Sequence, residues 1–291
     1  LRSAGLVRTG NVLPPPGIAP KTLRTAALSL PPAALETLTL KQLGGNDTTR
    51  QRRKKVLDLL AQEAFPIDFS WIYAETGSGY SDLKFLAEAG LLHFNETEVW
   101  RDPLEDIQVK PDVIPTLTAD QEKVWQQVQP GLGHADQKPY LLHGVTGSGK
   151  TEIYMRAVSE MLVQGRQVLM MVPEIAMTPQ TVRRFMARFP NQVGLYHSKL
   201  SDGERYDTWR RARSGDLKLI VGSRSALFVP LPNLRMIAID ECDHDSYDET
   251  EREPFYHAVE TAEALAEMSG ANLIFGSATP RITQYFDARR G

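Results

Sequence analysis

Six short apolar runs, most of them separated by segments of helical pattern, are the feature of this chain that most constrains its fold. They occupy residues 140–143, 167–172, 193–196, 217–221, 236–239 and 272–275. Strands that alternate with helices predict a parallel sheet covered by helices on both faces. The carboxyl ends of parallel strands meet at one edge of the sheet, and ligands bind there. The sequence therefore predicts an α/β fold whose functional residues directly follow these runs.

A glycine-rich segment follows the first run and precedes a helical segment. Residues 144–151 read Gly-Val-Thr-Gly-Ser-Gly-Lys-Thr and satisfy the GxxxxGK[ST] pattern of a phosphate-binding loop, or P-loop. Backbone amides and the helix dipole would hold the phosphates of ATP, Lys150 would reach the β and γ phosphates, and Thr151 would hold Mg²⁺. The alternative interpretation is a glycine-rich turn with a surface lysine. The candidate phosphate-binding residues are Gly144, Thr146, Gly147, Ser148, Gly149, Lys150 and Thr151.

Two acids, Asp240 and Glu241, directly follow the apolar run at residues 236–239. Carboxylates at the end of a buried strand suit magnesium-dependent hydrolysis of a nucleotide. Asp240 would hold Mg²⁺, and Glu241 would orient or deprotonate the attacking water. The alternative is an acidic turn after a core strand. Together with Lys150, these two acids are the candidate catalytic residues and predict an NTP hydrolase.

Composition and charge limit the class of protein. The 291 residues suit about two domains. The single cysteine, Cys242, excludes an internal disulfide. No signal peptide opens the sequence, and the longest apolar run, residues 168–172, is too short to span a membrane, so we expect a cytoplasmic protein without membrane contact.

Charge is distributed unevenly along the chain. Residues 1–55 contain ten Lys or Arg against two acids, whereas residues 240–267 contain eleven acids against one base. The basic run at residues 50–55 has two interpretations: it contacts DNA phosphates, or it is a solvated helix face. The acidic segment at residues 247–253 predicts a surface loop that repels DNA.

Four segments are predicted from the pattern. Residues 1–20, rich in glycine and proline, suit a linker or a trimmed domain edge. Residues 21–105 predict a small winged-helix domain, because a helical pattern beginning near Lys21 is followed by a possible β-hairpin at residues 91–100. Residues 106–116 predict a linker. Residues 117–291 carry the six runs and predict an ATP-binding lobe.

The order of the motifs resembles that of superfamily 2 helicases, which implies a RecA-like first helicase lobe. Val-Pro-Glu at 172–174, Gly-Ser-Arg-Ser-Ala at 222–226 and Gly-Ser-Ala-Thr-Pro at 276–280 accompany the P-loop and the two acids. The resemblance implies that Ser277 and Thr279 couple hydrolysis to strand movement and that Gln121 reads the adenine edge; a solvated helix residue is the alternative for Gln121. It implies DNA-backbone contacts by Pro173, Glu174, Thr178, Ser223 and Arg224.

Longer segments resemble the PriA family of primosomal replication-restart helicases from about residue 20 to the end. The segments that carry this resemblance are residues 172–180, 196–198, 222–228 and 276–280. The resemblance implies an ATP-dependent, 3′-to-5′ DNA helicase of the bacterial cytoplasm that acts at stalled or forked replication DNA. Its implied partners are forked and single-stranded DNA, single-stranded-DNA-binding protein and primosome proteins, and we expect a monomer. Zinc is expected only in a C-terminal part that these residues do not include.

One departure from the family concerns the segment after residue 239. It reads Asp-Glu-Cys-Asp, where the family usually has Asp-Glu-Glu-His. How Asp243 communicates with Ser277 and Thr279 is therefore open. Two other functions also stay open: another superfamily 2 translocase in repair or restriction, and a fork-binding scaffold without independent ATPase in this truncated form.

Overall fold

The computed structural model describes residues 17–63, 65–134, 137–251 and 253–290. The chain divides into two compact units, Leu1–Trp100 and Arg101–Gly291. Of the predicted linker at residues 1–20, the part before residue 17 lies outside the described residues. Within the described residues, no helix combines the length and the apolar character that crossing a membrane requires.

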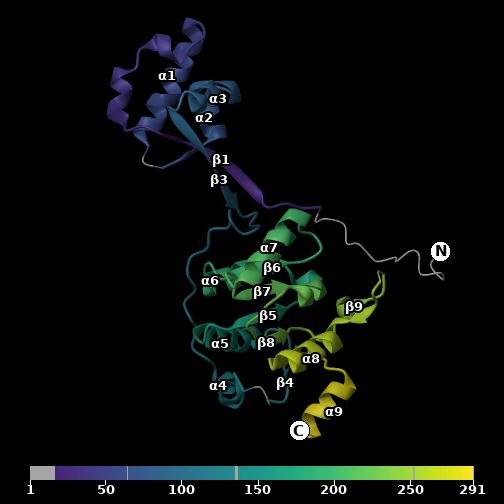
Figure 1. Ribbon diagram of the computed structural model, residues 1–291. Helices are drawn as coiled ribbons and strands as arrows, with labels where there is room; N and C mark the ends of the chain where they lie inside the picture. The colour runs from purple at the N-terminus through teal and green to yellow at the C-terminus, as the bar shows by residue number, and fades with distance from the viewer. Residues whose placement is uncertain (1–16, 64, 135–136, 252, 291) are drawn as a thin grey trace, which may run out of the picture. The chain divides into compact units, whose positions relative to one another are not determined.

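The first unit combines an antiparallel sheet with helices (Figure 1). Its strands β1 (Lys21–Leu28), β2 (Ile67–Asp68) and β3 (Leu92–Val99) lie in the order β2-β1-β3. The helices between them are η1 (Pro32–Thr37), η2 (Leu40–Leu43), α1 (Asp47–Gln62), α2 (Phe69–Thr76) and α3 (Tyr80–Glu88). Apolar side chains from α1, α2, α3 and the sheet form one core.

Two sequence predictions for this unit are wrong. The helical pattern expected from Lys21 onward begins with a strand, and the hairpin expected at residues 91–100 is a single strand. Asn95 and Glu96, the expected turn, pair with Thr25 and Arg24 of β1. A polar Asn-Glu pair is tolerated within a strand whose partner supplies the backbone hydrogen bonds. That partner lies about seventy positions earlier, where local periodicity cannot detect it. The winged-helix assignment stays a prediction.

The basic run of α1 divides between two roles. Arg52 and Arg53 pair with the buried carboxylate of Asp82 at 2.6 and 3.0 Å. The Arg53 guanidinium also lies 3.8 Å from the ring centroid of Phe85. Lys54 and Lys55 are exposed, and among the residues that the structure describes they have no ion pair. Part of the run therefore stabilises the unit, and only the rest is available to solvent or phosphates.

The second unit contains the predicted parallel sheet. Its strands lie in the order β4-β11-β8-β5-β7-β6, and all neighbouring pairs are parallel. The strands are β4 (Tyr140–His143), β5 (Gln167–Met171), β6 (Val193–Tyr196), β7 (Leu219–Gly222), β8 (Leu234–Ile239) and β11 (Asn272–Ser277). Each lies within about two residues of a predicted apolar run, so the fold class is confirmed.

Helices cover both faces of this sheet (Figure 1). Helices α4 (Ala119–Val128), α5 (Lys150–Val163) and α6 (Pro179–Arg188) share one core, whereas α7 (Asp202–Ser214) and α8 (Ala258–Ser269) share the other. Successive side chains of a strand point to opposite faces. Accordingly, Met170 of β5 lies in the first core and Met171 in the second.

Short elements complete the second unit. They are η3 (Gln129–Gly131), η4 (Glu174–Ala176), η5 (Arg224–Phe228), η6 (Asp245–Tyr247), β9 (Asp248–Glu249), β10 (Tyr256–His257) and α9 (Ile282–Arg290). The two short strands β9 and β10 pair with each other in antiparallel fashion.

The segment from Arg101 to α4 belongs to the second unit and packs against its helices. The Arg101 main-chain N–H donates to Asp207 at 2.9 Å, and Asp102 accepts from Arg211 at 2.5 Å. Leu104 is buried in the core that α5 and α6 share. Further along, the main-chain oxygen of Pro115 accepts from Arg156 of α5 at 2.8 Å. Of these contacts, only that of Pro115 lies within the predicted linker at residues 106–116. The others involve residues that the sequence assigns to the predicted winged-helix domain at residues 21–105.

Candidate functional site

The glycine-rich segment forms a loop between the end of β4 and the start of α5. Gly147 and Gly149 have φ values of +81° and +88°, in the left-handed region that favours glycine. A Cβ on Gly149 would lie only 2.0 Å from Nε2 of Gln121. The loop is therefore closely packed at Gly149 and exposed from Val145 to Ser148. Apart from that of Glu152, which donates to the Gly149 oxygen at 2.9 Å, the first N–H groups of α5 lack intrahelical partners and form a site for anions.

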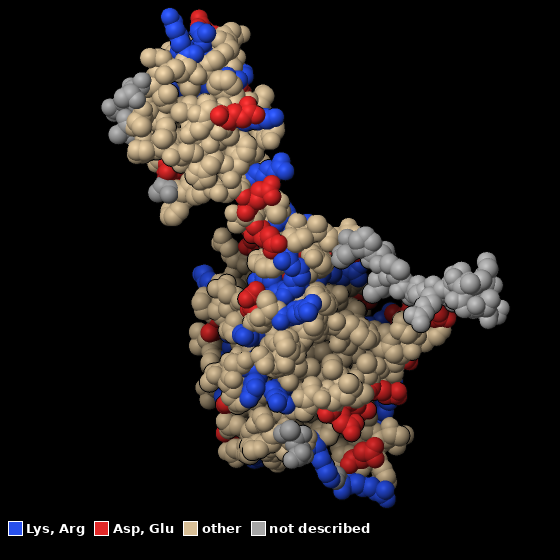
Figure 2. Space-filling view, viewed as in Figure 1, with Lys and Arg blue, Asp and Glu red and all other residues tan. Residues whose placement is uncertain are grey.

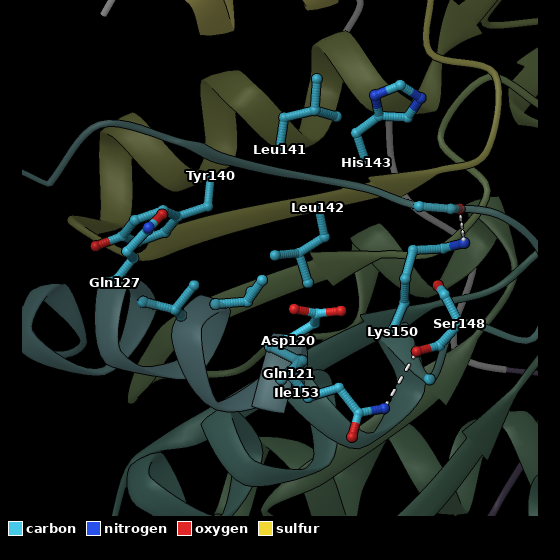
Figure 3. Close-up of a pocket in the computed structure, with 14 residues that line it drawn as sticks. Asp120, Gln121, Gln127, Tyr140, Leu141, Leu142, His143, Ser148, Lys150 and Ile153 are labelled. Carbon is cyan, nitrogen blue, oxygen red and sulfur yellow. Dashed lines mark hydrogen bonds between the residues drawn. The ribbon is translucent and has the colours of Figure 1, made fainter. Parts of the chain in front are cut away.

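Lys150 and Gln121 lie on either side of this loop (Figure 3). The Lys150 ammonium donates to the main-chain oxygens of Gly144 at 2.6 Å and Val145 at 3.3 Å. Gln121 donates through Nε2 to the Ser148 oxygen at 3.1 Å and accepts at Oε1 from the Thr118 main-chain N–H. Gln121 is thus not a freely solvated helix residue, because it ties the start of α4 to the loop.

An apolar hollow of about 360 Å³ opens beside the loop (Figure 3). Val124 and Val128 of α4, Leu142 of β4 and Ile153 of α5 line it. Gln121, Gly149 and Lys150 form its boundary on the side of the loop. Such a hollow, apolar with a few polar groups, suits a flat heteroaromatic ring.

The two acids stand at the end of β8, as the sequence predicts. Asp240 follows a strand whose residues from Met236 to Ile239 are fully buried. Burial raises the pKa of Asp240, and hydrogen bonds from Tyr154 and from the Glu241 main chain oppose this shift. Glu241 is exposed and has a φ of 47°. A non-glycine residue in the left-handed region is held in a strained conformation, a feature that concentrates at functional sites.

A second hollow, of about 650 Å³, brings the P-loop and these acids together. Gly149 and Lys150 line both hollows, so the two adjoin at the loop. The residues that line the second hollow and were predicted from sequence are Thr146, Gly147, Gly149, Lys150, Thr151, Asp240, Glu241 and Thr279.

Sequence reasoning missed Arg184 of α6, which lines the same hollow. It is exposed, and in the described part of the chain it has neither an ion pair nor a hydrogen bond. The neighbouring Arg183 does not line the hollow. Arg184 lies four residues after the end of the 172–180 motif, and only the orientation of α6 distinguishes the two arginines.

The residues at this hollow fit a nucleotide with a divalent cation. Within the described residues, no group of three or more His, Cys, Asp or Glu could hold a metal ion. Mg²⁺ needs no such cage, since it is held by one or two protein oxygens together with phosphates and water. The hydroxyl of Thr151 and the carboxylate of Asp240 are oxygen ligands of this kind and line the same hollow.

Asp243 joins the acidic segment to the residues after β11. The hydroxyl of Ser277 donates to Asp243 Oδ1, and that of Thr279 donates to Oδ2 at 2.7 Å. Burial would raise the pKa of Asp243, but the hydrogen bonds from Ser277 and Thr279 outweigh it and hold this pKa below its ordinary value. Asp243, the fourth residue of the Asp-Glu-Cys-Asp segment, therefore contacts both candidate coupling residues directly.

The segment after Asp243 differs in part from its sequence prediction. Tyr247, expected in a surface loop, is buried in the core that α7 and α8 share, and its hydroxyl donates to the main-chain oxygen of Asp240 at 2.7 Å. Cys242 is also fully buried, and burial, with Asp243 nearby, raises the pKa of its thiol to about 12. A thiol with that pKa is protonated at neutral pH and is a poor nucleophile.

The candidate DNA-binding residues after β5 occupy different environments. Pro173 is buried, whereas Glu174 is half-buried and accepts a hydrogen bond from Ser198. Thr178 is exposed and caps α6 by accepting from the Thr181 main-chain N–H at 3.3 Å. Of these three candidates, only Glu174 and Thr178 present side chains to solvent.

The candidates after β7 lie close to the acidic segment. Ser223 is buried at the start of η5. The Arg224 guanidinium pairs with Glu249 at 2.9 Å and donates to the Asp248 main-chain oxygen at 2.5 Å. Arg224 would have to leave these partners to contact a DNA phosphate.

Exposed acids also lie along α8, in the lower part of the molecule where red side chains gather in Figure 2.

Comparison with known proteins agrees with this geometry. The family model described as DEAD/DEAH box helicase matches residues 118–287. The chain is 39% identical to the replication restart protein PriA of Bacillus subtilis over 86% of this chain and 31% of that protein. It is 43% identical to PriA of Synechocystis over 72% of this chain and 25% of that protein. The chain thus spans about a third of the length of these relatives or less.

Two solved structures match part of this chain at low sequence identity. A structure of RecG bound to a three-way DNA junction is 23% identical, with a TM-score of 0.44, over 60% of this chain and 22% of that chain. The helicase domain of Hef from Pyrococcus furiosus is 20% identical, with a TM-score of 0.45, over 60% of this chain and 35% of that chain. On the family match over residues 118–287, the chain belongs to the DEAD/DEAH box helicases, with replication restart proteins among its relatives.

Proposed function

We propose that this chain is the nucleotide-binding part of an ATP-dependent DNA helicase that restarts replication at stalled or forked DNA. The observation that carries the proposal is the meeting of the P-loop with Asp240 and Glu241 around one hollow of about 650 Å³. The similarity to replication restart proteins supports the choice of DNA substrate and of process. Movement in the 3′-to-5′ direction rests on the family resemblance alone.

In this proposal the nucleotide lies across both hollows. The base occupies the apolar hollow, where Gln121 faces its edge, and the phosphates lie on the loop. Lys150 exchanges the main-chain oxygens of Gly144 and Val145 for phosphate oxygens, because an ammonium is better neutralised by an anion than by carbonyl dipoles.

The acids divide the work of hydrolysis. Thr151 and Asp240 would hold Mg²⁺, which would neutralise charge on the phosphates. Glu241, exposed at the hollow, orients the attacking water or accepts its proton. Asp243 transmits the hydrolysis of ATP to the segment after β11 through its hydrogen bonds with Ser277 and Thr279. Glu174, Thr178 and Arg224 are the proposed side-chain contacts to the single-stranded DNA backbone, with Pro173 and Ser223 contributing through their backbone.

The remaining assignments are also proposals. The first unit would serve as a winged-helix domain, and residues 117–291 as the first motor lobe. Single-stranded-DNA-binding protein and primosome proteins would be partners in the bacterial cytoplasm, because the curated relatives are replication restart proteins. By the same family resemblance, we propose that the complete protein is a monomer that also contains zinc and a second motor lobe.

Replacing the P-loop lysine tests the proposal. Lys150→Ala should abolish ATP hydrolysis by the complete protein and leave binding to forked DNA mostly intact, because the lysine contacts phosphates of the nucleotide rather than DNA. ATP turnover and fork binding of the complete protein are the two measurements. In this chain, the same change should abolish binding of a fluorescent ATP analogue.

Lys110→Ala is the matched control, since Lys110 is exposed and lines neither hollow. It should keep both nucleotide binding and turnover. Normal turnover in the Lys150→Ala protein would remove the P-loop assignment.

A further inference from the structure

A tyrosine hydroxyl is buried beside the proposed metal ligand. Tyr154, four residues after Lys150 on α5, is fully buried, and its hydroxyl donates to Asp240 Oδ1 at 3.2 Å. The Glu241 main-chain N–H donates to the same oxygen at 3.1 Å. Counting only residues that the structure describes, Asp240 Oδ2 accepts no hydrogen bond. Oδ2 is therefore the oxygen left for a ligand.

The same hydroxyl explains why a glycine occupies position 276. A Cβ on Gly276 would lie 1.4 Å from the Tyr154 hydroxyl oxygen, so any side chain there would displace the phenol. The Gly276 main-chain oxygen accepts from the Cys242 N–H at 3.0 Å. The phenol thus fills the space between the P-loop helix, the end of β8 and β11.

We propose that Tyr154 is a positioning residue that directs Oδ2 of Asp240 toward the metal, a role that rests on the proposed nucleotide hydrolysis. Rotation about the Cβ–Cγ bond would exchange the two carboxylate oxygens. The Tyr154 hydroxyl and the Glu241 N–H together hold Oδ1 on the protein side. Hydrogen-bond partners of metal-binding carboxylates orient them and tune the affinity for the metal.

Tyr247 provides a matched control within the same site. It is also fully buried, and its hydroxyl donates to Asp240, but to the main-chain oxygen at 2.7 Å. In both variants, one oxygen atom is removed from a buried phenol that donates a hydrogen bond to Asp240. Only the loss of the Tyr154 hydroxyl frees the carboxylate.

The test compares Tyr154→Phe with Tyr247→Phe in the whole chain. Binding of a fluorescent ATP analogue is measured in EDTA and in a titration with Mg²⁺. Tyr154→Phe should raise the Mg²⁺ concentration for half-saturation about tenfold, in line with lost partners of metal ligands. Its affinity for the analogue in EDTA should match that of the wild type. Tyr247→Phe should leave the Mg²⁺ requirement unchanged.

The outcomes separate the two ideas. If the wild-type chain binds no nucleotide, the proposed function fails. If the wild type binds and Tyr154→Phe needs no more Mg²⁺ than the wild type, or if both variants need equally more, the positioning role is wrong. For a variant that does not fold, 3-fluorotyrosine placed at position 154 preserves the shape of the side chain. Its ¹⁹F resonance should shift when Mg²⁺ is added to the ATP complex, and an unmoved resonance would overturn the proposal.

Discussion

Single side chains determine the chemistry at the carboxyl edge of the sheet. Asp240 is largely buried and held by two donors, whereas Glu241, the next residue, is exposed with a φ of 47°. That conformation costs about 1–3 kcal/mol in most settings. The conformation of Glu241 places the two adjacent carboxylates in different environments. That of Asp240 suits a metal ion, and that of Glu241 suits a water molecule.

Arg184 carries the prediction at this scale. Arg184→Ala should weaken binding of ATP about tenfold, because a hydrogen bond to a charged group contributes about 1.5–3 kcal/mol. Binding of ADP should change less if the guanidinium contacts the terminal phosphate. Calorimetric titration of the chain with ATP and ADP measures both affinities.

Arg183→Ala is the control, since Arg183 is an exposed arginine on the same helix that does not line the hollow. Equal loss of ATP affinity in the two variants would indicate a general effect of helix charge, not a phosphate contact.

Helices in the first unit depend on one buried carboxylate. Asp82 of α3 accepts hydrogen bonds from Arg52 and Arg53 of α1, and its side chain is 2% exposed. Burial would raise the pKa of Asp82, but the two arginines outweigh it and lower this pKa. The ion pairs therefore join α1 to α3 in a pH-dependent manner.

The first unit should lose stability in acid. A carboxyl group whose pKa is lower in the folded state stabilises the fold above its unfolded pKa, and the contribution is lost as pH falls through the folded value. Asp82→Asn should remove this acid dependence and destabilise the unit by about 3 kcal/mol at neutral pH, because two arginines lose their buried partner. Hydrogen exchange of α1 and α3 at a series of pH values, corrected for intrinsic rates, measures both effects.

Asp47→Asn is the control, because Asp47 pairs with Arg50 on the surface and its side chain is 92% exposed. Its effect should be small, as for exposed ion pairs in general. An Asp82→Asn protein as stable as the wild type would contradict the role of the pair.

At the scale of the whole molecule, one sheet carries the proposed nucleotide site and most of the motifs. The segment from Arg101 to Pro115 is bound to this sheet unit by Asp207, Arg211 and Arg156. By the resemblance to superfamily 2 helicases, we also expect a second lobe that supplies an arginine finger to the transition state. The described residues contain one six-stranded sheet and therefore one such lobe.

Residues 1–291 alone should bind nucleotide but show little DNA-stimulated hydrolysis, because no arginine from a second lobe reaches the γ phosphate. ATP turnover with and without forked DNA, compared with the complete protein, measures this. Robust stimulation by DNA in the isolated chain would show that the lobe contains all the groups needed for hydrolysis.

The sequence alone predicted the parallel sheet and the positions of the glycine-rich loop and of the two acids after β8, because each depends on residues adjacent in the chain. Strand periodicity and a glycine pattern before a helix are local signals. It failed for β3, whose hairpin interpretation ignored a partner strand about seventy residues away. It also could not choose between Arg183 and Arg184.

Tertiary structure decided which side chains meet at the sheet edge. Tyr154 and Asp240 are 86 residues apart, and Asp243 and Thr279 are 36 apart, yet each pair shares a hydrogen bond. No local pattern encodes these contacts, because they arise only when parallel strands bring their carboxyl ends together and exclude water from the phenol and the carboxylate.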